Sequence, residues 1–222
     1  MSEAELDEAF ESAWSNEGFV SRDHEEARLA AGRAALRRFR EAQLEPGAVI
    51  PTYVEREFAF TLGGDRIRGR WDRVDVVPLD ESRGRSHPDD AVIDPVADRA
   101  DVVEPTLGIL GPEHVTITDY KSSDVRDPVK ARQRARDSLQ LQIYAMGYEA
   151  MTGRLPDEVA LHFLESGLVG RVPMDRRRLA KARERIGQAA TGIRARDYTP
   201  RPDYLACGYC PFRDICPSSV AR

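Results

Sequence analysis

The sequence predicts an α/β fold, in which a mixed central sheet of about five strands is flanked by helices. Segments rich in β-branched and aromatic residues are the expected strands, at 53–62, 65–77, 115–121, 157–165 and 167–174. Segments with helical periodicity are expected helices, at 2–14, 22–43, 127–151 and 176–194. Gly63-Gly64 separates the first two strands and is a hairpin-turn signal.

The 222 residues are enough for one domain with a substantial core. We expect an N-terminal helical segment at 1–50, a core domain at 51–200 and a cysteine-rich tail at 201–222. Residues 78–113 are rich in Pro, Asp and Gly and have no clear period, and a structureless loop of this length is uncommon in a compact domain. We interpret them as an insertion between two strands; alternatively, Ala91–Ile93 and Leu107–Leu110 pair locally.

The most informative stretch is Val115–Lys121, which begins as a buried strand and ends in an acid and a base. Because side chains alternate across a strand, Asp119 and Lys121 point to the same face as the apolar residues before them. Two ionisable groups at the end of a core strand are costly unless they pair or hold a metal. The stretch is therefore a candidate site.

A second acid lies in a similar setting upstream. On the strand 65–77, Asp72 and Val74 should share one face, while Trp71, Arg73 and Asp75 should share the other. The pair Arg73 and Asp75 is interpreted as an ordinary solvated ion pair. Asp72 beside an apolar residue has no such simple surface explanation.

Together these residues predict a site for Mg²⁺ or Mn²⁺, because hard cations take oxygen ligands and magnesium commonly uses one or two carboxylates. Asp72 and Asp119 would supply the carboxylates, and the backbone carbonyl of Tyr120 could supply a further oxygen. Lys121 would then orient the nucleophile or stabilise charge that develops on a phosphate.

The ordered motifs resemble the PD-(D/E)XK nuclease superfamily, and within it the RecB/AddB-like nuclease domain found at the C-terminus of UvrD/Rep-type helicases. They are Gly69–Asp75, Asp119–Ser122 and Gln140–Tyr144. The resemblance implies a restriction-endonuclease-like fold, with Asp72 and Asp119 as metal ligands and Lys121 as the catalytic lysine. It also implies that Gln140 and Tyr144 either contact DNA or support the site.

The same resemblance implies a DNA exonuclease-type hydrolase that acts in DNA repair or recombination on single strands delivered by a helicase motor. No G-x-x-x-x-G-K-[ST] phosphate-binding loop occurs in the 222 residues, so that motor would lie outside this sequence. The alternative is a non-catalytic module that guides DNA or braces a helicase.

All three cysteines lie close together near the C-terminus, at Cys207, Cys210 and Cys216. This spacing indicates a metal or cluster site, for which four thiolates are usual. The resemblance implies a [4Fe–4S] cluster completed by one distant N-terminal cysteine, which has no counterpart here. We expect that the chain is a fragment of a longer protein; alternatively, the cluster is lost or has a non-cysteine ligand.

The net charge of −5 hides an uneven distribution. Residues 1–113 carry 14 Lys and Arg against 25 Asp and Glu, whereas residues 114–222 carry 19 against 13. A local basic surface suffices to bind phosphates. The candidates are Arg126, Lys130, Arg132, Arg134, Arg136, Arg171, Arg176, Arg177, Arg178, Lys181, Arg183 and Arg185.

The N-terminal residues are acidic and lack the charged and apolar regions of a signal peptide. No run of 18 apolar residues is present either. We therefore expect a cytoplasmic protein with no membrane partner.

Overall fold

A computed structural model describes residues 2–79 and 112–221, and it confirms the predicted α/β fold with a mixed five-stranded sheet. The predicted insertion, including the alternative local pairing, falls largely on residues 80–111, outside the described residues. The elements are α1 (Glu3–Ser12), α2 (Arg22–Leu44), β1 (Tyr53–Leu62), β2 (Asp65–Pro78), β3 (Glu113–Lys121), α3 (Pro128–Asp137), α4 (Leu139–Thr152), β4 (Glu158–Phe163), β5 (Val169–Pro173), α5 (Arg176–Arg194) and α6 (Tyr204–Gly208).

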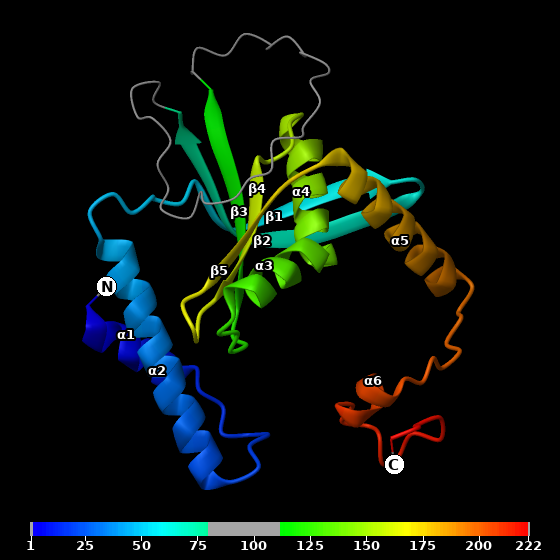
Figure 1. Cartoon of the computed structure of the whole chain (residues 1–222), viewed down its shortest axis with the longest axis horizontal. Coiled ribbons are helices and arrows are strands. Elements are labelled where there is room, and N and C mark those ends of the chain that lie inside the picture. Colours follow the sequence, from blue (N-terminus) through cyan, green and yellow to red (C-terminus); the bar gives the residue numbers. More distant parts are fainter. Residues whose placement is uncertain (1, 80–111, 222) are drawn as a thin grey trace.

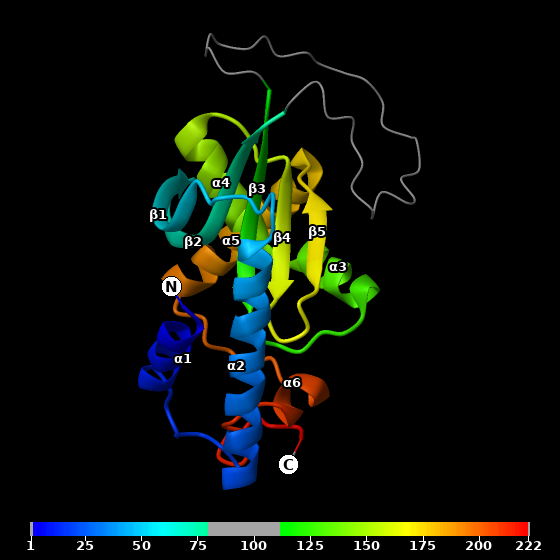
Figure 2. The same ribbon diagram turned by 90° about the vertical axis from the view of Figure 1, so that its left-hand side faces the viewer.

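The strands lie in the order β1-β2-β3-β4-β5, with β3 and β4 parallel and every other neighbouring pair antiparallel. The crossover from β3 to β4 contains α3 and α4, as a parallel pair requires. Figure 2 shows α2 on one side of the sheet and α3, α4 and α5 on the other. The central strands are therefore buried, whereas the outward side of the β1–β2 hairpin remains exposed.

The single long helix predicted at 127–151 is wrong: α3 and α4 are separate helices that meet at Ser138. Ser138 has an extended backbone (φ −67°, ψ 110°), and its hydroxyl accepts a hydrogen bond from the Leu141 N–H. A serine that caps the next helix in this way favours a break over continuation. As a result, Gln140 lies in the first turn of α4.

The alternation of β2 side chains between the two faces of the sheet is interrupted near the middle of the strand. The Trp71 indole N–H donates to the Tyr144 carbonyl on α4, so Trp71 lies on the α4 side. Arg73 contacts the opposite side, which places Val74 on the α4 side as well. Two residues three positions apart cannot share a face of a regular strand. The strict alternation predicted for Trp71 to Asp75 is therefore wrong, and the irregularity falls at Asp72.

Arg73 joins the sheet to the segment that precedes it. Its guanidinium donates to Asp75, to Gln43 Oε1 at 2.8 Å and to the Val49 carbonyl at 2.7 Å. The side chains of Arg73 and Asp75 are only 10% and 14% exposed. The predicted solvated ion pair is thus wrong, because the residues after α2 cover it. It fixes α2 against the sheet.

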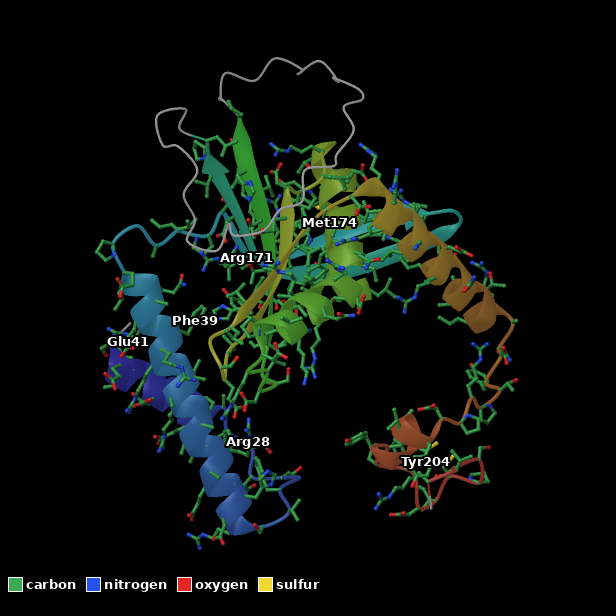
Figure 3. All side chains as sticks on the ribbon, viewed as in Figure 1. Arg28, Phe39, Glu41, Arg171, Met174 and Tyr204 are labelled. Atoms are coloured by element: carbon green, nitrogen blue, oxygen red, sulfur yellow. The ribbon has the colours of Figure 1, made fainter. Side chains whose placement is uncertain are left out.

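The ring of Phe39 strengthens that attachment. Its centroid lies 5.3 Å from the Tyr120 ring and 5.8 Å from the His162 ring, both on the α2 side of the sheet. Figure 3 shows Phe39 on the side of α2 that faces the strands, and Glu41 on the side that faces away. Arg28 of α2 adds a bidentate ion pair with Glu165, with N–O distances of 2.9 and 2.7 Å.

Gly69, the glycine of the motif that contains Asp72, is required by packing. A Cβ at Gly69 would lie 2.4 Å from the Phe58 ring, and a Cβ at Gly147 of α4 would also lie 2.4 Å from it. The ring, which is 4% exposed, is therefore held between β2 and α4 at two positions that lack side chains. This contact allows the hairpin β1–β2 to approach α4 closely.

We predict that Gly69→Ala lowers the free energy of unfolding by about 1–3 kcal/mol, because the added methyl overpacks the Phe58 pocket. Gly64→Ala is the matched control, since a Cβ there meets no atom within 4 Å; its effect should stay within about 0.5 kcal/mol. Urea unfolding of both variants measures the difference. Equal stabilities would show that Phe58 does not require the glycine.

Candidate active site

Asp72 and Asp119 lie next to each other where strands β2 and β3 separate. The last residue pair between these strands is Arg73 with Thr118. Immediately beyond it, Asp72 Oδ2 accepts a hydrogen bond from the Tyr120 backbone N–H at 2.9 Å. The charge of Asp72 also raises the pKa of Asp119. The structure therefore brings together the two acids that the sequence proposed.

Asp119 is a buried carboxylate with incomplete compensation. It is 1% exposed, and burial raises its pKa, while the Lys121 ammonium acts in the opposite direction. Lys121 Nζ lies 2.7 Å from Asp119 Oδ2 as an ion pair. Apart from this ammonium, Oδ2 has no hydrogen-bond partner among the described residues. Such an oxygen is suited to a cation.

The Tyr120 carbonyl points toward the same place. The Lys121 carbonyl accepts a hydrogen bond from Leu164 N–H, just beyond β4, so Lys121 presents its backbone groups to that side. Backbone groups of successive strand residues point to opposite edges. Tyr120 therefore presents both its N–H and its C=O to the β2 side, where the N–H already meets Asp72.

The helix residues of the third motif are joined to the lysine. Lys121 Nζ donates to Gln140 Oε1 at 2.8 Å, and Gln140 Nε2 donates to the Tyr144 hydroxyl at 2.9 Å. Burial raises the pKa of Tyr144 to about 12, and the charges of Asp72 and Asp119 act in the same direction. The hydroxyl therefore stays protonated at neutral pH. Because it accepts a hydrogen bond from Gln140, its own proton is available for a hydrogen bond to Asp119.

The donor set fits a hard divalent cation. The carboxylates of Asp72 and Asp119, together with the backbone carbonyl of Tyr120, are oxygen donors of the kind that Mg²⁺ and Mn²⁺ take. Among residues 2–79 and 112–221, no three His, Cys, Asp or Glu side chains are grouped as a metal site. Two carboxylates with water and phosphate oxygens completing the shell is the usual arrangement for magnesium.

Glu55 is a residue near this site that the sequence did not indicate. It has a φ of 50°, a left-handed conformation that is uncommon for a residue with a side chain. The β1–β2 register skips Glu55 and Asp72 while remaining regular on both sides. Its charge also raises the pKa of Tyr144. A glutamate inside a strand pattern gives no sequence signal of such a conformation.

The three cysteines lie in α6 and the turns after it, away from the sheet (Figure 1). None of the three is in a disulfide within the described residues, and all three are of intermediate exposure. As stated above, the described part of the chain contains no grouped metal-binding set of three such side chains. The cysteines therefore do not, as placed here, form the predicted cluster site.

The predicted basic residues fall into two groups. Those on α3 are exposed and make no ion pair within the described residues: Lys130, Arg132, Arg134 and Arg136. In the second group, several arginines already form ion pairs with acidic side chains. Arg176 and Arg183 both pair with Glu149, Arg178 pairs with Asp175, and Arg171 pairs with Glu158. The α3 surface is thus the more available for phosphate.

A model of the PD-(D/E)XK nuclease superfamily matches residues 99–217, more than half of the chain. The chain belongs to this superfamily. The match includes Asp119, Lys121, Gln140 and Tyr144, whereas Asp72 precedes it. Membership indicates a nuclease, and superfamily members typically use Mg²⁺. The association with a helicase is not part of what the match shows.

The solved structure of SSO0001 has 16% sequence identity with this nuclease-superfamily chain and a TM-score of 0.43. The alignment covers 87% of this chain and 72% of that one. No curated protein matches the chain. Within the described residues, no helix has the length and apolarity needed to cross a bilayer.

Proposed function

We propose that this domain hydrolyses DNA phosphodiester bonds with the help of a divalent cation, as an exonuclease-type enzyme. The observation that carries the proposal is the meeting of Asp72, Asp119 and Lys121 where β2 and β3 separate, with a buried carboxylate oxygen of Asp119 that has only the Lys121 ammonium beside it among the described residues. Asp72, Asp119 and the Tyr120 carbonyl would hold Mg²⁺ or Mn²⁺. A bound cation would supply Lewis-acid stabilisation of the negative charge on the phosphate.

The chain's own residues position the lysine. The ammonium of Lys121 is held between Asp119 and Gln140, so it has a fixed direction despite a flexible stem. From there it orients the attacking water or stabilises negative charge on the phosphate oxygens. Gln140 fixes the lysine, and Tyr144 fixes Gln140. Of the two roles considered for these helix residues, we therefore propose support of the site.

The exposed basic side chains of α3 would contact the DNA backbone. This helix ends at Asp137, three residues before Gln140, whose side chain meets Lys121. When unpaired arginines bind phosphates, they release the counterions that are condensed on the nucleic acid. This release favours binding and makes the affinity depend on the salt concentration.

We also propose that the domain works with a helicase motor, as the RecB/AddB-like resemblance implies, on single strands that the motor delivers. The proposed division is a helical segment at 1–50, the nuclease core at 51–200 and the tail at 201–222. This part of the proposal rests on the motifs alone. Helicase motifs in the gene that encodes the chain would support it, and a gene without them would contradict it.

For the cysteines we propose a cluster that needs a fourth ligand from outside this sequence, and we derive no step of the reaction through it. Protein purified without oxygen should then contain far less than one [4Fe–4S] cluster per chain. Iron and acid-labile sulfide analysis measures this. A stoichiometric cluster in this chain would show that the ligand set is already complete.

Substitution of Lys121 by Ala, or of Asp119 by Asn, should lower Mn²⁺-dependent DNA cleavage about a hundredfold or more. Asp119 is a proposed metal ligand and Lys121 is not. Mn²⁺ should therefore raise the melting temperature of wild type and of Lys121→Ala but not of Asp119→Asn. Glu41→Gln, on the face of α2 turned away from the sheet, is the control for the carboxylate change.

Two outcomes would contradict the proposed activity or the proposed metal site. If wild type binds Mn²⁺ and DNA but never cuts, the domain is the non-catalytic guiding module. If Mn²⁺ stabilises Asp119→Asn as much as wild type, Asp119 is not a ligand and the site is misassigned.

Gln140→Ala should lower kcat about tenfold and leave the affinity for DNA unchanged, because the lysine loses its orienting partner while the DNA surface stays intact. Gln188→Ala, an exposed glutamine on α5, is the matched control. Steady-state kinetics and binding in EDTA measure the two quantities separately. A weaker affinity with an unchanged kcat would mean that Gln140 contacts DNA instead.

A further inference from the structure

The outward face of the β1–β2 hairpin carries three arginines that neither the fold nor the proposed chemistry uses. Arg66, Arg68 and Arg70 alternate along β2 and are all exposed. The residues between them lie on the opposite face, where Ile67 packs against the core and Gly69 meets Phe58. The arginines therefore form one row on a rigid strand.

Two of the three arginines have no ionic partner within the described residues, whereas Arg70 pairs with Glu55 and lies opposite Glu57 in the β1–β2 register. Arg66 and Arg68 make no ion pair or side-chain hydrogen bond with the described residues. Side chains at alternate positions of a strand lie roughly 7 Å apart, so the three positive charges repel one another. Such an arrangement is stabilised by an anion that spans several positions.

One end of the row lies at the candidate active site. Arg70 pairs with Glu55 at 2.8 Å, and the charge of Glu55 raises the pKa of Tyr144. Arg70 is also two residues before Asp72 on the same strand. Glu55 is held here by the left-handed conformation described above. The row thus begins one ion pair away from the site and continues toward the hairpin turn.

The shape of the surface fits an extended ligand. All three arginines border a groove of about 760 Å³, together with Glu57, Phe58 and Ala59 of β1, Gly69 of β2 and Met151 of α4. The far end of the hairpin is fixed, because Asp65 pairs with Arg194 of α5. Figure 1 shows the hairpin extending from the sheet toward α5.

We propose that this arginine row binds the phosphate backbone of a single nucleic-acid strand and leads it to Asp72 and Asp119. The proposal rests on the proposed nuclease function and names the path of its substrate. Arg66 and Arg68 supply charges that are free before binding. Arg70 exchanges Glu55 for a phosphate when the strand arrives. A basic row beside a groove whose exposed apolar borders are Ala59 and Met151 suits a single strand, whose bases need apolar contact.

The test compares two double variants of the full chain that each lose two exposed, unpaired arginines. One is Arg66→Ala with Arg68→Ala; the control is Arg196→Ala with Arg201→Ala, after the end of α5. Binding of a fluorescent oligothymidylate of about twenty nucleotides is measured in EDTA over a range of salt concentrations. The hairpin variant should bind about tenfold or more weakly, with a salt slope smaller by about 1.4, as two lost phosphate contacts require. The control should change little.

A second measurement separates the path from the chemistry. Hydrolysis of bis(p-nitrophenyl) phosphate, which is too small to reach the hairpin, should be unchanged in the hairpin variant, while cleavage of the long strand falls. Equal losses of binding in the two double variants, or no binding of the oligonucleotide by wild type at low salt, would overturn the proposed path. Binding that depends on the hairpin without any cleavage would support the path and contradict the nuclease function instead.

Discussion

The hydrogen bond from the Tyr120 backbone N–H to Asp72 is the interaction on which the site depends. It occupies the position at which the next ladder bond between β2 and β3 would form. The strands therefore separate there, and a side chain replaces a backbone partner. Because the acceptor is a carboxylate, the end of the ladder also carries a negative charge beside Asp119. One bond thus ends the sheet locally and places two acids together.

Two acids at close range and partly buried would be destabilising without compensation. The structure compensates Asp119 partly, through Lys121, and leaves one oxygen without a hydrogen bond. Lys121 is in turn oriented by Gln140 from the first turn of α4. The break at Ser138 decides this geometry, since a continuous helix would place Gln140 in a different turn with a different direction.

The supporting contacts come from rigid elements on both sides of the sheet. On one side, Trp71 and Phe58 fix the hairpin to α4, through an indole hydrogen bond and through close approach at two glycines. On the other side, the Arg73 network fixes the segment after α2. Side chains held by packed strands and helices keep their positions better than side chains on loops. The same contacts that stabilise the fold therefore pre-organise the site.

The sequence by itself determined the five strands and the helix α5 at the residues expected, because periodicity and capping residues act locally, but not the break between α3 and α4. It also singled out Asp72, Asp119 and Lys121 as candidate site residues, since their residue types and order carry the resemblance. It did not determine the face change at Asp72, the burial of Arg73 with Asp75, or the strained backbone of Glu55. Each of these depends on contacts between residues far apart in the chain, such as Trp71 with Tyr144 and Arg73 with Gln43. Only the tertiary structure decides such contacts, because local patterns fix the type of an element but not which neighbour covers it.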